Sequence, residues 1–448
     1  MNQNKINYVL DIFKKIYDTP DLYDYLSYTD CTLTSSGVLV KQSEQSINLF
    51  SKNELFDLKT VAYADWDDRS LPFLLNSSSD LIQEVFTVKD NLVIINYDII
   101  AASFYLLSGW QELSPNNYDQ HNRFKYSGSI QKVLGFTRIP LVNYYFDILK
   151  TALEKFLNKR IKMRSSSIQD IMVFLTHDID IINRIWFEDT MSSIRKKEFL
   201  NIPAIFISGF RGKIQKSLIR KILEIESSLS VKSTFFMLGK KGTTNNIKCA
   251  DYKLTSKGVR EIIAAIRENG SEVALHGSPG TETNRNLLKS ELSMIDPEPK
   301  GNRFHFLLFK SGNTAAALQA AGIKYDSTLG FAEDIGFRNS FCHPFYLYDI
   351  ENDRPTEVIE IPLIVMDTTL RRKEYLGSGT QSIEEIRQLI REIKKFGGVF
   401  TLLWHNNYFS GYKHSGFREM YGEIIASLKE AEAVFLTGSE ISDRYRDF

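Results

Sequence analysis

The second part of the chain alternates between short apolar runs and longer segments with hydrophobic residues at helical spacing, such as residues 256–268 and 382–396. The apolar runs predict seven strands, at residues 171–177, 232–238, 272–276, 302–308, 358–365, 398–404 and 433–436. Strands that alternate with helices usually pair in parallel. We therefore expect an α/β fold with a distorted (β/α) barrel of about seven strands. A doubly wound open sheet is the alternative.

The first part of the chain is less regular and predicts a smaller α+β domain. Helices are expected at residues 5–17, 101–113 and 140–157, and strands at residues 38–40, 47–50, 85–88 and 92–97. Residues 158–170 are basic and rich in serine, as is typical of a linker. We expect an N-terminal domain of unknown role over residues 1–165 and a barrel domain over residues 166–448.

Net charge, cysteine content and the lengths of the apolar segments indicate the class of protein. Basic and acidic residues number 55 each, so no overall charge attracts nucleic acid or an anionic membrane. Cys31, Cys249 and Cys342 form no CxxC pair, which favours a reducing compartment. The first residues form no apolar run typical of a signal peptide, and no stretch is long enough for a membrane span. The expectation is a soluble cytoplasmic protein of unknown oligomeric state.

Titratable side chains follow the first strand of the predicted barrel. His177, Asp178 and Asp180 come at the end of the apolar run 171–176. If the strand pattern continues, the two carboxylates share one face. Two crowded carboxylates repel each other unless a cation, a shared proton or a basic group compensates. This pair predicts a metal site or an acid–base pair.

Histidines occupy or close other predicted strands. His276, His305 and His405 lie in or directly after the runs 272–276, 302–308 and 398–404. Because the carboxyl ends of barrel strands converge, these side chains are expected to meet the two aspartates. Carboxylate and imidazole together form a donor set that zinc accepts.

Four segments in this order resemble the motifs of polysaccharide deacetylases. They are Asp178-Ile-Asp180, Leu275-His276-Gly-Ser, Gly301-Asn-Arg303-Phe-His305 and Leu403-Trp-His405-Asn. The resemblance covers about residues 170–440, and further segments are similar to a bacterial subgroup with an uncharacterised N-terminal domain. It implies a barrel that holds one divalent metal, expected to be Zn²⁺, and removes acetyl groups from N-acetylated sugars or a polysaccharide precursor.

The resemblance also implies a role for each matching residue. Asp178 corresponds to the general base, and Asp180 and His276 to metal ligands. His405 corresponds to the acid that protonates the departing amine. Arg303 corresponds to the arginine that keeps the base ionised.

One position departs from the family pattern. The family has a second metal-binding histidine four residues after the first, where this chain has Gly280. His305 or His177 could replace it. If neither does, the alternative is a catalytically inactive barrel that binds carbohydrate or scaffolds polysaccharide biosynthesis. A third hypothesis is that the chain hydrolyses a small non-sugar amide.

Two further side chains are candidate contacts to the substrate. Trp404, next to His405, could stack on a sugar ring or belong to the core. Arg338 could bind substrate or pair with an acid such as Asp334.

Overall fold

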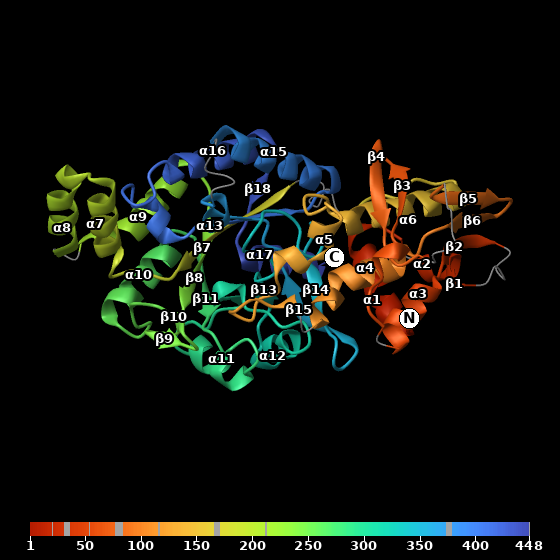
Figure 1. Cartoon of the computed structure of the whole chain (residues 1–448), viewed down its shortest axis with the longest axis horizontal. Helices are drawn as coiled ribbons and strands as arrows, with labels where there is room; N and C mark the ends of the chain where they lie inside the picture. The colour runs from red at the N-terminus through yellow and green to blue at the C-terminus, as the bar shows by residue number, and fades with distance from the viewer. Residues whose placement is uncertain are drawn as a thin grey trace.

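The computed structural model describes residues 1–19, 21–30, 36–52, 54–76, 84–114, 117–164, 171–210, 213–372 and 379–447. Cys31 and the expected domain boundary at residue 165 lie outside these ranges, so the boundary stays a prediction. Figure 1 shows the strands of the larger sheet in the middle of the second part of the chain, with the elements of residues 1–164 beside it.

The larger sheet has ten strands in the described part of the chain, in the order β14-β15-β13-β12-β11-β8-β7-β17-β16, with β18 beside β7. Their bounds are β7 Met172–Ile179, β8 Ser233–Leu238, β11 Glu272–Gly277, β12 Gly301–Phe304, β13 Tyr325–Asp326, β14 Phe345–Asp349, β15 Arg354–Glu360, β16 Val365–Met366, β17 Val399–Leu403 and β18 Val434–Phe435. All neighbours pair in parallel except β14 and β15. The predicted α/β class is confirmed. Each of the seven predicted segments contains a strand, but residues 305–307 of the segment 302–308 form a short 3₁₀ helix, and further short strands are present.

One stretch of chain joins the two sides of this sheet. The predicted strand 358–365 is divided into β15, which pairs with β13, and β16, which pairs with β17. Four residues, 361–364, connect the two pieces. The sheet therefore curls, and the carboxyl ends of β7, β11, β12, β16 and β17 face a common space, as in a barrel.

The strands are apolar because both faces of the sheet are covered. All eight residues of β7 and all six of β8 are buried. Helices surround the sheet (Figure 1). They are α7 Ile185–Lys196, α8 Ile202–Phe210, α9 Lys213–Ser228, α10 Lys257–Glu268, α11 Arg285–Leu292, α12 Thr314–Ala321, α13 Asp367–Leu370, α15 Gly379–Phe396, α16 Phe417–Glu430 and α17 Gly438–Asp447. Within the described residues, no helix has both the length and the apolar character needed to cross a membrane.

Residues 1–164 form a mixed sheet in the order β1-β2-β6-β5, a β3–β4 hairpin and helices around them. The bounds are α1 Gln3–Ile16, α2 Leu22–Tyr25, β1 Leu26–Thr29, β2 Gly37–Lys41, α3 Glu44–Lys52, β3 Ala62–Trp66, β4 Arg69–Phe73, β5 Phe86–Lys89, β6 Leu92–Ile95, α4 Ile99–Leu107, α5 Ile130–Val133 and α6 Leu141–Leu157. The strand predicted at 47–50 is wrong, because these residues lie in α3. The Ser43 hydroxyl accepts from the Ser46 N–H and caps this helix.

A buried ion pair connects this part of the chain to the barrel. The Arg338 guanidinium donates to both carboxylate oxygens of Glu112, at 2.8 and 2.7 Å. Gln131 adds a hydrogen bond to the Arg338 carbonyl. Of the two alternatives for Arg338, the structure shows pairing with an acid, which is Glu112 and not Asp334, and the buried side chain is not a substrate contact. Its role is to join two parts of the fold.

Replacing Glu112 with glutamine is expected to lower the free energy of unfolding by about 3–5 kcal/mol, because it leaves the buried Arg338 charge uncompensated. Urea unfolding measures this change. As a control, Glu385→Gln removes a partner of Arg138 at a more exposed position and should cost about 0–1 kcal/mol. Equal losses in both variants would contradict the assignment.

Candidate active site

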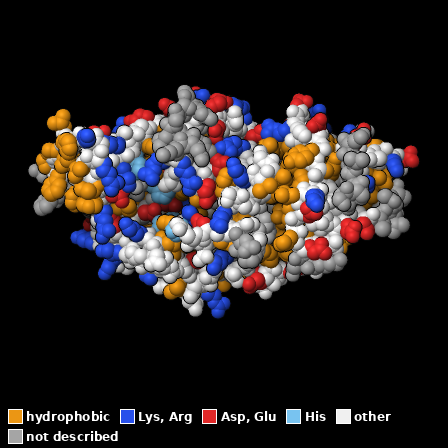
Figure 2. All heavy atoms as spheres, in the orientation of Figure 1, with side chains coloured by type: hydrophobic (Ala, Val, Ile, Leu, Met, Phe, Trp, Pro, Cys, Tyr) orange, Lys and Arg blue, Asp and Glu red, His pale blue; other side chains and the backbone are white. Residues whose placement is uncertain are grey.

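The expected site residues converge at the carboxyl ends of neighbouring strands. Asp178 is in β7, and Asp180 is the first residue after this strand. His276 in β11 lies opposite Arg303 in β12. His305 follows β12, and His405 follows β17. The parallel register brings these residues, which are far apart in sequence, into one hollow, where Figure 2 shows histidine and acidic side chains together.

Asp180, His276 and His305 have the geometry of a metal site. The Asp180 Oδ1 atom lies 3.4 Å from His276 Nε2 and 3.4 Å from His305 Nδ1. The two imidazole nitrogens are 3.0 Å apart. Ligand bonds of 2.0–2.2 Å in a tetrahedral arrangement place ligand atoms about 3.3 Å apart. The three atoms thus have nearly the spacing that a zinc ion requires.

Hydrogen bonds on the far side of each ring fix which nitrogen faces the site. His276 Nδ1 lies 2.8 Å from the Arg303 carbonyl, and His305 Nε2 lies 2.9 Å from the Lys248 carbonyl. Because a carbonyl only accepts, these nitrogens carry the hydrogens, and in the neutral rings the nitrogens that face Asp180 carry lone pairs. Asp180 Oδ1 is itself buried without a hydrogen-bond partner among the described residues. Three acceptor atoms facing one another fit a bound cation.

The electrostatics of these three residues also favour positive charge. Burial opposes ionisation of Asp180, but His305 and His276, followed by His405, outweigh it and hold the pKa of this carboxyl far below its usual range. Burial lowers the pKa of His305. In His276, Asp178 and Asp180 outweigh burial and raise the pKa. The site therefore attracts either a proton or a metal ion, and metal binding would displace that proton.

Asp178 lies beside this cluster and is held by Arg303. The Asp178 Oδ2 atom is 3.5 Å from His276 Nε2, while its Oδ1 accepts from Arg303 at 3.0 Å. The Arg303 side chain is fully buried and also donates to Thr176 Oγ1, the Ser327 carbonyl and Ser327 Oγ. It lies 4.4 Å from the centre of the Phe236 ring. The buried guanidinium holds the Asp178 carboxylate in a fixed position, which a general base needs.

His405 also borders the cluster and is oriented by Asp367, a residue that sequence reasoning missed. Its Nδ1 is 2.8 Å from Asp367 Oδ1, and its Nε2 is 3.8 Å from Asp180 Oδ2. Burial alone would lower the pKa of His405, but Asp367, with Asp180 and Asp178, raises it to about 10. A histidine in this state can donate a proton. Asp367 directly follows β16, and an acid at a strand end was the available signal.

His305 takes the place expected for a histidine at position 280. Gly280 lies in the loop after β11 with φ +96°, a conformation that favours glycine. His305 is instead directed into the site by a turn in which Phe306 and Leu307 both have positive φ, at 62° and 55°. Two consecutive non-glycine residues in this region are strained, as is common at functional sites. His305 was one of the two replacements considered from the sequence.

The other replacement, His177, is not at the site. Its Nδ1 lies 2.7 Å from the Trp404 carbonyl, and its Nε2 lies 2.9 Å from Glu226, in the core beneath. The predicted stacking role of Trp404 is also wrong. Its ring is 0% exposed and packs against Phe417 and Tyr421. Alternation along the strand turns His177 and Trp404 away from the side that Asp178 and His405 face.

A cavity of about 300 Å³ opens over the cluster. Besides the acidic and imidazole groups, it is lined by Arg123, Phe306 and Arg372. Arg123 comes from the N-terminal part of the chain, where Asp119 holds it at 2.8 Å. Sequence reasoning missed it, because residue 123 is distant in sequence and lies in no strand of the barrel.

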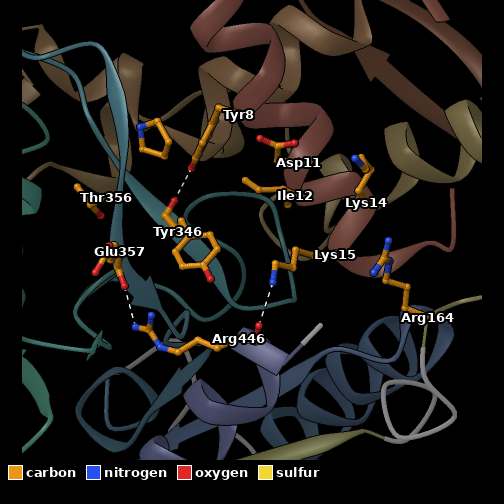
Figure 3. Close-up of a pocket in the computed structure, with 11 residues that line it drawn as sticks. Tyr8, Asp11, Ile12, Lys14, Lys15, Arg164, Tyr346, Thr356, Glu357 and Arg446 are labelled. Carbon is orange, nitrogen blue, oxygen red and sulfur yellow. Dashed lines mark hydrogen bonds between the residues drawn. The ribbon is translucent and has the colours of Figure 1, made fainter. Parts of the chain in front are cut away.

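A larger cavity of about 690 Å³ lies elsewhere, between α1 and the start of β15 (Figure 3). Lys15 donates to the Arg446 carbonyl there at 3.2 Å, and Arg446 donates to the Glu357 carbonyl at 2.7 Å. Its described lining includes no histidine. The smaller cavity is therefore the candidate active site.

A buried pair of carboxyl groups supports the strands behind Arg303. Asp326 accepts from Asn302 at 2.7 Å, and Glu360 accepts from the Leu329 N–H at 2.8 Å. Burial raises the pKa of Asp326. Burial, with the charge of Asp326, raises the pKa of Glu360 well above its usual value. The folded protein is therefore expected to hold a proton on this pair up to a higher pH than the unfolded chain does.

This proton makes stability depend on pH. The pKa is higher in the folded state, so the stabilisation is complete below the unfolded value of about 4.3 and falls as the pH rises through the folded value. The loss is about 1.4 kcal/mol for each pH unit between the two values. Urea unfolding between about pH 5 and pH 8 should show this slope in the native chain and a flatter one in Glu360→Gln. Identical slopes would contradict the shared proton.

Two of the comparisons with known proteins concern the first part of the chain and the chain as a whole. Residues 1–158 match the model of a family of unknown function, DUF7033. No curated protein matches the chain.

Several solved structures are similar to part of the chain. A putative polysaccharide deacetylase from Mycobacterium smegmatis is 20% identical with a TM-score of 0.40, covering 62% of this chain and 91% of that one. A chitin deacetylase from Colletotrichum lindemuthianum is 14% identical with a TM-score of 0.33, covering 61% and 88%. A CE4-family pseudoenzyme from Bacillus anthracis is 14% identical with a TM-score of 0.29, covering 61% and 66%. The structural matches thus include both deacetylases and a pseudoenzyme, and the function has to be argued from this chain's own site.

Proposed function

We propose that the chain is a metal-dependent hydrolase that removes acetyl groups from N-acetylated sugars or a polysaccharide precursor. The observation that carries this proposal is the set of three acceptor atoms, on Asp180, His276 and His305, at 3.0–3.4 Å from one another. A carboxylate and an imidazole in contact with this set, Asp178 and His405, supply the base and the acid. Both are oriented by buried partners, Arg303 and Asp367.

A divalent cation held by Asp180, His276 and His305, of which Zn²⁺ fits the donors best, would polarise the acetyl carbonyl and lower the pKa of an attacking water. Asp178, held in place by Arg303, takes a proton from this water as it attacks the amide carbon. His405 gives its Nε2 proton to the nitrogen of the sugar, so the amine can leave. Asp367 holds the His405 ring so that Nε2 faces the reacting groups.

The same groups explain why an amide is the expected substrate. Breaking an amide bond requires a nucleophile on one side of the carbonyl and a proton donor for the departing amine. Asp178 lies 3.5 Å from His276 Nε2 and His405 lies 3.8 Å from Asp180 Oδ2, so both groups border the same cluster. A cavity of about 300 Å³ is at the small end of the range for ligand sites and suits one sugar ring at a time.

The test is to measure bound zinc and acetate release from N-acetylated oligosaccharides with the full chain. We expect about one zinc per chain and acetate release that a chelator abolishes. A metal-free protein that binds the oligosaccharide without releasing acetate would support the inactive barrel instead. Release of acetate only from small non-sugar amides would support the third hypothesis, in which the substrate is not a sugar.

Arg123 is expected to contribute to substrate binding, because it reaches the cavity from outside the barrel. Replacing it with alanine should raise KM about tenfold and leave kcat nearly unchanged, since the guanidinium lies at the cavity wall and not among the reacting groups. Steady-state acetate release against oligosaccharide concentration measures both constants. Arg69→Ala, which removes an ion pair with Glu392 away from the cavity, is the control. A fall in kcat with unchanged KM would contradict this role.

A further inference from the structure

Exposed apolar side chains gather on one helical hairpin next to the candidate active site. The hairpin, residues 185–210, consists of α7, the short helix η5 (Phe199–Asn201) and α8. Of the fifteen large hydrophobic side chains that are exposed in the described residues, six lie here. They are Phe187, Ile194, Phe199, Leu200, Phe206 and Ile207. Figure 2 shows them as an apolar end of the molecule, where Figure 1 places α7 and α8.

The tip of this hairpin is convex. Leu200 is 95% exposed and Phe199 is 60% exposed, so the described residues provide no groove around them. Trp186 packs inside the hairpin, with its ring centre 5.6 Å from that of Phe206. The hairpin is therefore internally packed while its outer side chains remain uncovered.

Basic residues lie directly beside the apolar tip. Arg195, Lys196 and Lys197 are consecutive and exposed, and they immediately precede Glu198 and Phe199. The other acidic residues of the hairpin contact partners outside it. Glu188 pairs with Lys413, and Asp189 is buried and accepts a hydrogen bond from Ser410. The exposed surface of the hairpin thus combines apolar side chains with a positive cluster, although the whole chain has no net charge.

The hairpin is attached to the loops that carry the site. Residues 182–184 lie between Asp180 and the start of α7. The backbone N–H groups of Ile182, Asn183 and Arg184 donate to the Asp251 carboxylate at 2.7–2.8 Å. On the other side, Lys196 donates to the Tyr412 carbonyl at 2.8 Å, in the segment that follows His405. The tip is therefore held in a definite place relative to the cavity.

We infer that this hairpin docks the protein on an anionic membrane surface, with the active-site cavity beside the bilayer. Aromatic and leucine side chains at a convex tip enter the boundary between headgroups and acyl chains, and adjacent lysines and arginines pair with anionic headgroups. A protein partner fits less well, because the centre of a protein interface is depleted in lysine. This inference concerns binding and does not depend on the proposed hydrolysis.

Sedimentation of the full chain with vesicles tests the inference. Vesicles of phosphatidylcholine with phosphatidylglycerol should bind the protein, and vesicles of phosphatidylcholine alone should bind it weakly. The double change Phe199→Glu and Leu200→Glu should lower partitioning at least about tenfold, because two large apolar side chains no longer enter the bilayer. Arg195→Glu with Lys197→Glu should remove the preference for anionic lipid. Leu55→Glu, at a residue that is 80% exposed in the N-terminal part, is the matched control and should bind like the native chain.

Two outcomes would overturn the inference. One is native protein that does not sediment with anionic vesicles, or a Phe199/Leu200 variant that binds them as the native chain does. The other is a native dimer in sedimentation velocity that the same variant converts to a monomer, which would assign the hairpin to self-association. The substituted side chains are exposed, so thermal unfolding should be unchanged and failure to fold can be distinguished from loss of binding.

Discussion

Replacing Asp178 with asparagine is expected to lower the rate of acetate release at least about 10³-fold, because the amide cannot take the proton of the attacking water. The change is nearly isosteric, and Asp178 is not one of the three clustered ligand atoms. Bound zinc should therefore stay at the native level. Acetate release under saturating oligosaccharide, together with metal content, measures the two effects separately.

The control for this variant is another buried carboxylate. Asp98→Asn removes a charge that accepts from Tyr28, Ser43 and Ala101 in the N-terminal part of the chain. It should change stability but leave turnover close to native. If Asp178→Asn retained a large share of the native rate, Asp178 would not be the base.

Replacing His305 with alanine is expected to weaken zinc binding by more than about 100-fold and to abolish acetate release. The reason is that only Asp180 and His276 would remain as ligands. Loss of a partner that merely orients a ligand already costs about 10–100-fold in metal affinity, so loss of a ligand should cost more. Competition with a chelator of known affinity measures the change without relying on activity.

His121→Ala is the matched control for His305. The His121 ring contacts Phe306 with 5.3 Å between ring centres but is not one of the clustered ligands. Zinc affinity should be unchanged in this variant. Native zinc affinity in His305→Ala would show that another group completes the site, and it would remove the assignment of His305 as the replacement for a histidine at position 280.

Much of the barrel could be predicted from the sequence because its strands are buried on both faces. A fully buried strand such as β7 needs an unbroken apolar run, and the polar residues that end the run mark the edge of the sheet. Asp178, Asp180, His276 and His405 were recognisable for this reason. In parallel strands with helical connections, such ends face the same side.

The N-terminal part was harder to predict. Residues 47–50 have the composition of a strand, but they belong to α3, where the Ser43 cap and packing against neighbouring elements decide the conformation. In the larger sheet, the short strand β13 has two residues, too few for a periodic pattern. Tertiary pairing alone makes it part of the sheet.

The net charge of the whole chain does not show where charged side chains gather on its surface. The equal numbers of acidic and basic residues exclude a large overall field, but they do not reveal whether a few cations remain exposed together. In the hairpin of residues 185–210, Glu188 pairs with Lys413 and Asp189 is buried. The basic residues 195–197 are exposed at the surface. Composition alone could not predict this patch.

The sequence by itself determined the class of fold and the strand ends at which the chemistry gathers, because apolar periodicity and buried strands are local properties of the chain. Only the tertiary structure decided which residues complete the site. His305 lies beside Asp180 and His276 while position 280 is glycine, Asp367 contacts His405, and Arg123 reaches the cavity from the N-terminal part. Each of these depends on distances between segments far apart in sequence, and these distances are set by strand register and packing.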